Sequence, residues 1–142
     1  MTNRTVREET RNAWQTEQAG ARLAAALFPG DVVVVSGELG AGKTTFVRGA
    51  CRRLGVDGPV TSPTFEIGHV YAGRVEIAHI DLYRLPSLVG EDPGLLDDYL
   101  TPERIGFVEW PGEAAAGIER VAARVAIEHL GGDGRSIEIA TG

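Results

Sequence analysis

The stretch that decides the fold reads Gly37-Glu38-Leu39-Gly40-Ala41-Gly42-Lys43-Thr44. It matches the phosphate-binding pattern G-x-x-x-x-G-K-[ST] at every fixed position. Glycines let the backbone curl around a phosphate, so that N–H groups point inward and the N-terminus of the following helix adds partial positive charge. In such a loop Lys43 reaches the outer phosphates and the hydroxyl group of Thr44 binds Mg²⁺. Because the pattern is short, the flanking sequence has to support it.

The residues on either side of the loop supply that support. Residues 32–35 are four consecutive valines, which predict a buried strand. After the loop, apolar residues recur at the i, i+3, i+4, i+7 spacing of a helix with one buried face, at Val47, Ala50, Cys51 and Leu54. Strand, glycine loop and helix together favour a phosphate-binding loop over a glycine-rich turn before an ordinary helix.

The amino-acid composition and net charge narrow the possible classes of protein. The 142 residues are expected to form a single domain, residues 1–142, with ordinary hydrophobic (43%) and charged (24%) contents. A net charge of −6 argues against a sequence-independent grip on nucleic acid, which needs a basic surface. One cysteine allows no internal disulfide, and we see neither a membrane-length apolar run nor a signal peptide, so we expect a cytoplasmic protein.

Apolar periodicity predicts the remaining elements. We expect a strand over residues 5–10, a helix over 13–27 capped by Asn12, a hairpin of residues 66–71 and 75–81, a short helical turn within 95–100, a strand over 105–108, and a second hairpin of residues 124–129 and 135–140. The order of these elements predicts an α/β protein with a three-layer, P-loop NTPase-like fold. Its sheet is expected to be mixed and mostly parallel, flanked by helices and extended by antiparallel hairpins.

Two acidic residues each end an apolar strand. Asp81 closes the run at residues 77–81, and Glu109 follows residues 105–108. Ligands gather at the carboxyl ends of parallel strands, and P-loop enzymes place an acidic residue there to hold Mg²⁺ or its water. An Asp that merely forms a turn is the alternative. His79 shares a face with Asp81, and the sequence leaves open whether it is a structural or a proton-carrying histidine.

Two further features surround the predicted helix. Residues 60–65 form an exposed connection in which the Ser62 and Thr64 hydroxyls are candidates to meet Mg²⁺ or the γ-phosphate, as in a nucleotide-responsive switch. A rigid turn imposed by Pro63 is the rival interpretation. Arg48, Arg52 and Arg53 lie away from the apolar stripe of the helix, where we expect a solvated face.

Four motifs follow one another along the chain: the glycine loop through Thr45, then Thr61-Ser62-Pro63-Thr64-Phe65, His79-Ile80-Asp81-Leu82-Tyr83-Arg84-Leu85 and Val108-Glu109-Trp110-Pro111. Together they resemble the TsaE family, the bacterial ATPases of tRNA threonylcarbamoyladenosine biosynthesis. Many enzymes share the first motif, whereas the second and third together are specific. The resemblance spans residues 37–111 and fades over residues 86–98 and toward the C-terminus.

The resemblance implies a small P-loop ATPase that uses ATP and Mg²⁺. Family members work with two related partner proteins, TsaB and TsaD, which build the threonylcarbamoyl group onto adenosine 37 of tRNA. The ATPase supports repeated turnover of that complex and does not itself transfer the group. The chain would then meet tRNA only through its partners, which fits its acidic charge. No membrane or DNA partner is implied.

The resemblance also assigns roles to matching positions. It implies that the nucleotide contacts Gly37, Gly40, Ala41, Gly42, Lys43, Thr44, Thr45 and Trp110. Thr44 and Glu109 would form the Mg²⁺ site, with Asp81 as a second acidic residue acting through water. Thr64 would sense the γ-phosphate, which completes an expected catalytic set of Asp81, Glu109 and Thr64. For Trp110, a core or interface aromatic is an equal alternative.

Two other functions use the same loop. A small-molecule or nucleoside kinase needs a second substrate pocket and an arginine-rich lid, for which only residues 85–100 and Arg84 are at hand. A nucleotide-dependent scaffold would bind ATP without needing its hydrolysis. The guanine-reading motif [NT]-K-x-D is missing from the sequence, which makes a GTPase less favoured. With Arg84 as the nearby arginine, an ATPase would be weak alone and would depend on a partner.

Overall fold

The structure is a computed structural model that describes residues 4–38, 42–61, 68–82, 94–110, 118 and 120–141. The positions of Gly40, Ala41, Ser62, Thr64 and Arg84 therefore lie outside the described residues. The described elements, in chain order, are β1 (Arg4–Thr10), α1 (Ala13–Ala24), β2 (Val32–Gly37), α2 (Lys43–Arg53), β3 (Gly68–Ala72), β4 (Glu76–Asp81), α4 (Gly94–Asp97), β5 (Arg104–Glu109), β6 (Val121–His129) and β7 (Arg135–Thr141).

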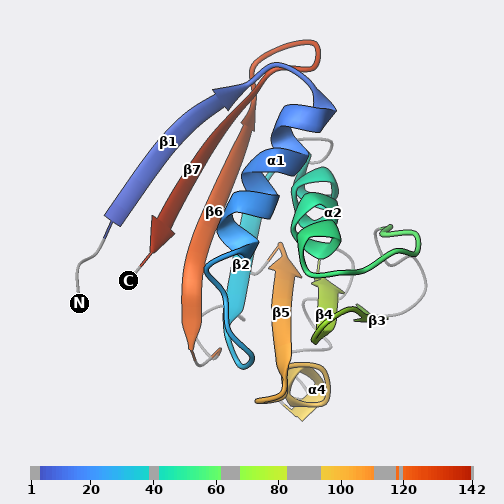
Figure 1. The fold of residues 1–142 in the computed structure, drawn as a ribbon. Helices are drawn as coiled ribbons and strands as arrows, with labels where there is room; N and C mark the ends of the chain where they lie inside the picture. The colour runs from blue at the N-terminus through green and yellow to red at the C-terminus, as the bar shows by residue number, and fades with distance from the viewer. Residues whose placement is uncertain are drawn as a thin grey trace.

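Parallel pairing forms the centre of the sheet and antiparallel pairing forms its two sides (Figure 1). The strand order is β1-β7-β6-β2-β5-β4-β3. Strands β6, β2, β5 and β4 run parallel. Strand β3 joins β4, and β7 and β1 join β6, in antiparallel pairs. The predicted mixed sheet with two antiparallel hairpins is confirmed, and parallel pairing is confined to the four central strands.

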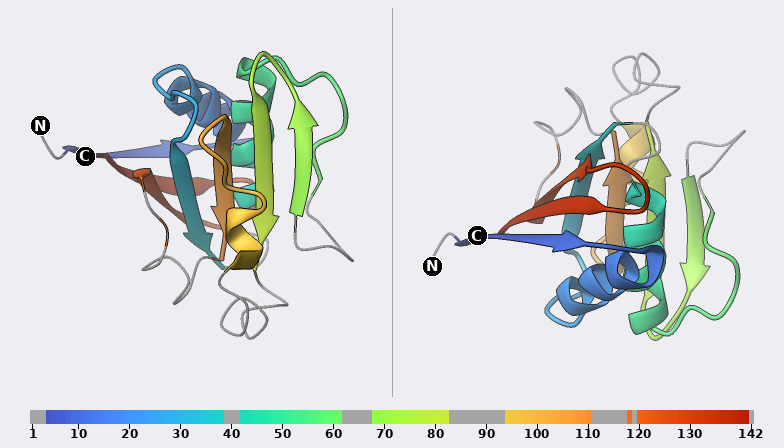
Figure 2. Two further views of the ribbon diagram at one scale, coloured as in Figure 1. Left: turned by 90° about the horizontal axis from the view of Figure 1, so that it is seen from below. Right: turned by 90° about the horizontal axis from the view of Figure 1, so that it is seen from above.

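The four valines of β2 are buried on both faces of the sheet. Val33 and Val35 belong to the core cluster that includes the buried residues of α1 and α2. Val32 and Val34 belong to a second cluster, which includes Leu96 of α4. Side chains alternate along a strand, so a continuous apolar run suits a strand covered on both faces. Figure 2 shows α1 and α2 on one side of the strands and α4 on the other, which is the expected three-layer arrangement.

Helix α1 begins where the sequence predicts and ends three residues early. The side chain of Asn12 caps the helix, because its Oδ1 accepts a hydrogen bond from the N–H of Gln15 at 2.8 Å. The Gln15 side chain in turn accepts from the N–H of Arg11 at 2.8 Å. The helix was expected to reach residue 27 but ends at Ala24, because Leu27 donates to the carbonyl of Ala24 in a tighter, three-residue turn.

Helices α1 and α2 meet backbone to backbone at two glycines. A methyl group on Gly20 would lie 2.0 Å from the carbonyl oxygen of Phe46, and one on Gly49 would lie 1.9 Å from the carbonyl oxygen of Glu17. Neither position has room for a Cβ atom, so glycine permits this close approach. Figure 1 shows the two helices side by side on the sheet. Helix α2, which carries Lys43 and Thr44, is therefore fixed against α1.

Helix α2 is closed at its C-terminus by Gly55. Its φ is +91°, its N–H donates to Arg52, and the N–H of Val56 donates to Cys51, which together form a Schellman motif. Cys51 is fully buried, and burial raises the pKa of its thiol to about 12, partly offset by the charge of Arg52. The cysteine thus acts as a small buried hydrophobe.

Two arginines of α2 hold the chain segment that leaves the helix. Arg48 donates to the carbonyl of Val60 at 3.2 and 3.3 Å. Arg52 donates to the carbonyls of Val56 at 2.9 Å and Gly58 at 2.5 Å. Arg52 and Arg53 are exposed, as the expected solvated face requires, and Arg48 is partly buried, while Arg48 and Arg52 in addition hold backbone carbonyls. They occupy backbone acceptors that follow the helix in sequence, and periodicity within the helix does not reveal such partners.

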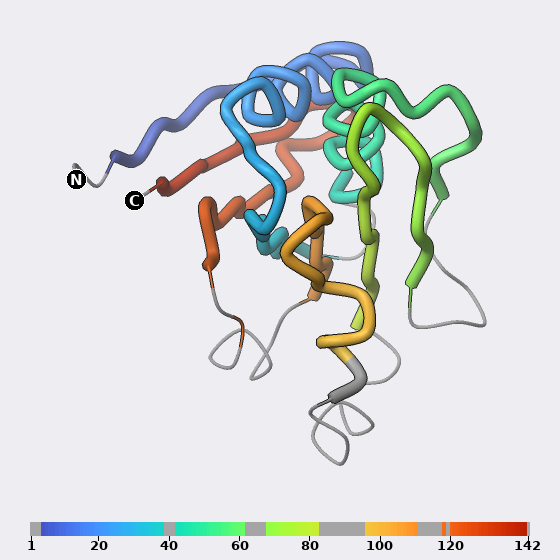
Figure 3. The backbone as a smooth tube through the Cα atoms, turned by 60° about the horizontal axis from the view of Figure 1, so that its bottom comes forward, coloured from blue at the N-terminus to red at the C-terminus, as the bar shows by residue number. Residues whose placement is uncertain are grey.

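The first and last strands lie side by side (Figure 3). Arg4 pairs with Thr141, and Thr10 pairs with Arg135. Strand β1 therefore forms one edge of the sheet, with β7 as its neighbour. The sequence predicted the strand but gave no sign of its partner. None of the helices in the described part of the chain is long and apolar enough to cross a membrane.

Candidate functional site

The carboxyl ends of three parallel strands bring the predicted polar residues to one edge of the sheet. Glu109 at the end of β5 pairs with Asp81 of β4 on one side and with Val35 of β2 on the other. Gly37, the last residue of β2, leads directly into the glycine loop. Because β2, β5 and β4 run parallel, Gly37, Asp81 and Glu109 lie at one edge of the sheet, and the two acidic residues end their strands as predicted.

Lys43 lies at the first position of α2 and is folded back onto its own loop. Its Nζ donates to the carbonyl oxygens of Gly37 at 2.9 Å and Glu38 at 2.8 Å. It also lies 4.0 Å from the centroid of the Trp110 ring, within the range of a cation–π interaction. The side chain is only 5% exposed. Burial lowers the pKa of Lys43, while the negative charges of Glu109 and, less strongly, Asp81 act in the opposite direction.

Thr44 and Glu109 face each other across the gap between α2 and β5. The Thr44 hydroxyl lies 3.1 Å from Oε2 and 3.3 Å from Oε1 of Glu109 and donates to this carboxylate. Glu109 is only 2% exposed, so its carboxylate needs polar partners. The structure thus brings together the two residues that the sequence assigned to a metal. Thr45 follows in the first turn of α2 and is partly buried.

A second partner of Glu109 comes from β4. The Nε2 atom of His79 contacts Oε2 of Glu109, and His79 is fully buried. Its Nδ1 atom lies 3.2 Å from the Tyr71 hydroxyl, which donates to the carbonyl of Thr61 at 3.2 Å. The pKa of Tyr71 is raised to about 12, mainly by burial and to a lesser extent by nearby negative charge, partly offset by the hydrogen bond to Thr61. His79 thus belongs to a hydrogen-bond chain and does not stand alone.

Sequence reasoning missed Tyr71. It lies on β3, where His69 is directly opposite His79 and Tyr71 is one diagonal step away. Diagonal neighbours across an antiparallel pair are within reach of an aromatic side chain, so the predicted hairpin held the signal. To predict the contact of Tyr71 with His79, the register of the hairpin has to be known, and the sequence alone does not determine it.

The described residues suit Mg²⁺ held jointly by protein and phosphate. Among them, no group of three or more His, Cys, Asp or Glu side chains could hold a metal by itself. Mg²⁺ in nucleotide sites usually takes one or two carboxylates, phosphate oxygens and several waters. The hydroxyl of Thr44 and the carboxylate of Glu109 supply the oxygen ligands of that mode of binding.

The N-terminus of α2 begins after a glycine that supplies no side-chain cap. Its N-cap residue, Gly42, has a φ of +100° and makes no side-chain capping bond. The Arg135 side chain lies alongside, because a methyl group on Gly42 would be 3.4 Å from its Nε. Arg135 also donates to the carbonyls of Gly132 and Gly134. Sequence reasoning missed this arginine, since it predicted the last hairpin without its place beside the loop.

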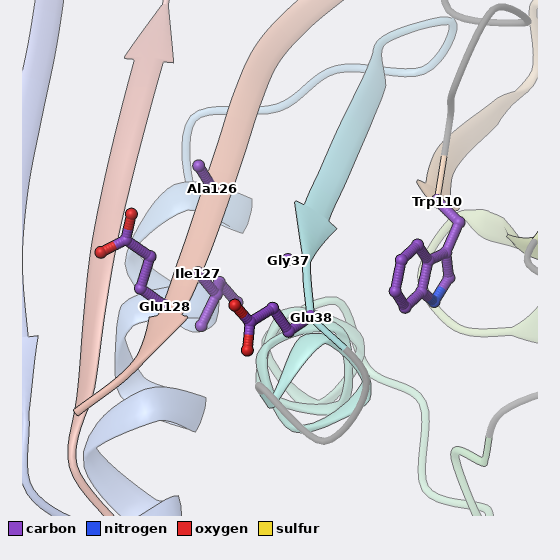
Figure 4. Close-up of a pocket in the computed structure, with 6 residues that line it drawn as sticks. All are labelled: Gly37, Glu38, Trp110, Ala126, Ile127 and Glu128. Atoms are coloured by element: carbon purple, nitrogen blue, oxygen red, sulfur yellow. The ribbon is translucent and has the colours of Figure 1, made fainter. Parts of the chain in front are cut away.

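A groove of about 530 Å³ crosses the carboxyl end of β2 (Figure 4). Trp110 stands on one side of it and residues of β6 stand on the other, with Gly37 and Glu38 between them. Its lining consists of Gly37, Glu38, Trp110, Ala126, Ile127 and Glu128. Trp110 is thus an aromatic wall of a groove beside the lysine and also packs against the second core cluster, so its position agrees with both interpretations.

A strand, a glycine loop and a helix that begins with Lys43 and Thr44, beside an acidic residue on the neighbouring strand, define the P-loop class of folds. The profile of one family, described as "Threonylcarbamoyl adenosine biosynthesis protein TsaE", matches residues 10–137. The chain therefore belongs to the TsaE family.

Individual relatives agree with this assignment. The chain is 40% identical to the "tRNA threonylcarbamoyladenosine biosynthesis protein TsaE" of Streptomyces coelicolor, over 82% of this chain and 80% of that one. It is 33% identical to the protein of the same name from Treponema pallidum, over 92% and 97%. The crystal structure of YdiB from Bacillus subtilis superposes with a TM-score of 0.76 at 29% identity, covering 99% of this chain and 88% of that one.

Proposed function

We propose that the chain binds ATP with Mg²⁺ and hydrolyses it, and that this activity serves the threonylcarbamoyladenosine modification of tRNA. The observation that carries the first part is the pair formed by Thr44 and Glu109, a hydroxyl and a buried carboxylate 3.1 Å apart beside the glycine loop. Membership of the TsaE family, with relatives named for tRNA threonylcarbamoyladenosine biosynthesis, supports the second part.

Phosphate binding would follow from the chain's own charges. Lys43 holds two neutral carbonyl oxygens, those of Gly37 and Glu38. A phosphate oxygen offers the same kind of acceptor with a full negative charge, and charge-assisted hydrogen bonds are stronger. The first N–H groups of α2 have no partner within the helix itself and add the partial positive charge of a helix N-terminus. Lysine and helix would thus exchange internal partners for the triphosphate.

The acidic residues would serve the hydrolytic step. Mg²⁺, when bound, neutralises charge on the phosphates and polarises them for attack by water. Thr44 and Glu109 would hold the ion. Asp81, next to Glu109 in the sheet register, would orient water at the metal or at the phosphate. Before nucleotide binds, the Trp110 ring keeps the lysine ammonium beside the loop.

We further propose that the chain acts in the cytoplasm with the TsaB–TsaD pair and meets tRNA through it. The net charge of −6 gives this chain little attraction for a polyanion at physiological salt. Its one cysteine is free and buried, which suits a reducing compartment. A partner would also supply or position an arginine, which can accelerate phosphoryl transfer by ~10³–10⁵.

Calorimetry with ATP and Mg²⁺ tests the nucleotide site. Lys43 is the only lysine of the chain, so no second lysine can replace it. We expect Lys43→Ala to weaken ATP binding by ~10²-fold, the scale of losing about 3 kcal/mol of charged hydrogen bonding. Arg53→Ala, which removes a cation from the exposed far end of α2, is the matched control and should bind as the parent does. Equal affinity of Lys43→Ala and the parent would refute the site.

The reaction is tested with partners present. We expect phosphate release from ATP to rise when the TsaB–TsaD pair is added, in the absence of any phosphate acceptor. Phosphate transfer to a nucleoside or other small acceptor would instead identify a kinase. ATP binding without phosphate release, even with the pair and tRNA present, would identify a scaffold. Tight tRNA binding by the isolated chain would contradict the indirect contact with tRNA.

A further inference from the structure

A hydrogen-bond chain that is buried at one end and exposed at the other joins the candidate metal carboxylate to the segment that follows α2. It runs from Glu109 through His79 and Tyr71 to the backbone of Thr61. The two ring-to-ring contacts along it, Tyr71 with His79 and Tyr71 with His69, have centroid distances of 6.0 and 5.9 Å. The proposed hydrolysis assigns no role to Tyr71 or to Thr61.

The direction of the hydrogen bonds follows from the donors available. The carbonyl of Thr61 can only accept, so the single hydroxyl hydrogen of Tyr71 is used there. The 3.2 Å contact with His79 is then a hydrogen bond only if Nδ1 of His79 carries a hydrogen and donates to the Tyr71 oxygen. Tyr71 thereby accepts from Nδ1, and a further hydrogen, carried either by Nε2 or by the carboxyl group, has to join Nε2 to Oε2 of Glu109.

The orientation of the carboxylate depends on this arrangement. His79 contacts Oε2 of Glu109, whereas Oε1 has only the longer, 3.3 Å contact with Thr44. Both His79 and Glu109 are shielded from water, so no solvent molecule can replace a lost partner without cost. Side chains that hold a metal ligand from behind fix its orientation and its affinity for the ion.

The other end of this series of hydrogen bonds, away from Glu109, lies at the start of the connection over residues 60–65. Tyr71 holds the carbonyl of Thr61, and Arg48 holds the carbonyl of Val60. Arg48 is itself 3.8 Å from Glu17 of α1. A displacement of Thr61 would remove the acceptor of the Tyr71 hydroxyl and free that hydroxyl to donate to His79 instead.

We propose that Tyr71 and His79 are positioning residues that hold the Glu109 carboxylate ready for Mg²⁺ and make this readiness depend on the position of Thr61. The inference rests on the proposed ATP–Mg²⁺ site and adds to it a link between the metal ligand and the segment after α2. In this role Tyr71 contacts His79 and the backbone of Thr61. It acts on the metal only through His79.

The test compares Tyr71→Phe with the parent. The substitution keeps the ring and removes only the hydroxyl. We expect the Mg²⁺ concentration for half-maximal ATP hydrolysis to rise by at least ~10-fold, the lower end of the usual loss for such residues. ATP affinity in excess EDTA should stay within about twofold of the parent, because Lys43 and the loop are untouched. Tyr99→Phe removes the same group from a tyrosine of the second core cluster and should leave both quantities as in the parent.

A second readout does not depend on activity. In the nucleotide-free protein, the ¹⁵N spectrum of the His79 ring should show a protonated Nδ1, and Tyr71→Phe should shift the Nδ1 signal while Tyr99→Phe does not. An unchanged Nδ1 signal in Tyr71→Phe, or an unchanged Mg²⁺ requirement, would overturn the proposal. If the parent itself failed to bind ATP–Mg²⁺, the proposed function would fall, and the His79 spectra would still decide whether Tyr71 orients this histidine.

Discussion

The ammonium group of Lys43 lies 4.0 Å from the centroid of the Trp110 ring while it donates to two carbonyls of its own loop. The position of the ring is set by the backbone, because Trp110 has a φ of +57° and its N–H donates to Val35 at 3.1 Å. Few non-glycine residues adopt such a φ, and those that do are often found at functional sites. The indole ring is therefore held in place, and its fluorescence should report whether the lysine side chain lies against it.

Tryptophan fluorescence should follow this lysine. The chain has two tryptophans, and Trp14 is 66% exposed, so Trp14→Phe leaves Trp110 as the single emitter. We expect ATP–Mg²⁺ to change the emission of Trp110, since Lys43 leaves the ring when it takes up phosphate. Adding Lys43→Ala to this background should abolish the change. Unaltered emission at a nucleotide concentration that saturates the protein by calorimetry would contradict the exchange of partners.

The pKa of Lys43 should lie below 10.5 in the free protein, because burial disfavours its charge. As the only lysine, it gives a single side-chain signal for NMR titration. The unfolded chain binds more protons between the lowered and the ordinary pKa, so this group makes stability rise with pH in that interval. Bound ATP should move the midpoint upward, and ATP affinity should fall as pH rises through the free-protein pKa. A midpoint at or above 10.5 without nucleotide would show that the lysine is solvated.

The two acidic residues at the sheet edge should be needed for hydrolysis. We expect Glu109→Gln and Asp81→Asn each to lower phosphate release, measured with the partner proteins present, by at least ~10²-fold, the usual scale for a lost positioned charge or base. Glu76→Gln is the control, because Glu76 begins the strand that Asp81 ends and forms an exposed ion pair with Arg104. Parent rates in both acidic-site variants would remove these residues from the reaction.

The contact between α1 and α2 should tolerate no side chain at Gly49. A Cβ there would lie 1.9 Å from the backbone of Glu17, so Gly49→Ala has to push two helices apart. We expect the free energy of unfolding in urea to fall by about 3 kcal/mol, the upper end of ordinary overpacking. Gly58→Ala is the control, since a methyl group on Gly58 meets nothing within 4 Å, and it should change stability by less than about 0.5 kcal/mol. Equal stability of the two variants would mean that the helices are not in contact here.

Local sequence patterns predicted most of the elements and the edge where the site lies. The valine run, the helix stripe and the polar ends of two strands each report on their own surroundings, which explains why β2, α2, Asp81 and Glu109 are where they were expected. Contacts between residues far apart in the sequence leave no local pattern of this kind. The pairing of β1 with β7 and the contact of Tyr71 with His79 depend on register, and a single sequence does not contain it.

The same limit explains the smaller differences. Helix propensity continues past Ala24, but the chain tightens there to enter the turn before β2. Arg48 and Arg52 looked like surface charge because their acceptors are backbone carbonyls, which every residue carries. The position of Arg135 beside the loop was not predicted for a different reason. Its strand was predicted, but the approach of that strand to Gly42 is a property of the folded sheet.

The pairing of the first strand with the last has a consequence for the making of the protein. On the ribosome β1 emerges well before its partner, because the side chains of Arg7 and Ser136, which meet at 3.1 Å, are 129 positions apart. Until β7 has been translated, β1 is a strand without a neighbour, the kind of edge that invites pairing with other chains. Its charged sequence, Arg-Thr-Val-Arg-Glu-Glu-Thr, discourages such pairing. The charges of β1 thus make aggregation of the nascent chain less favourable until β7 has been synthesised.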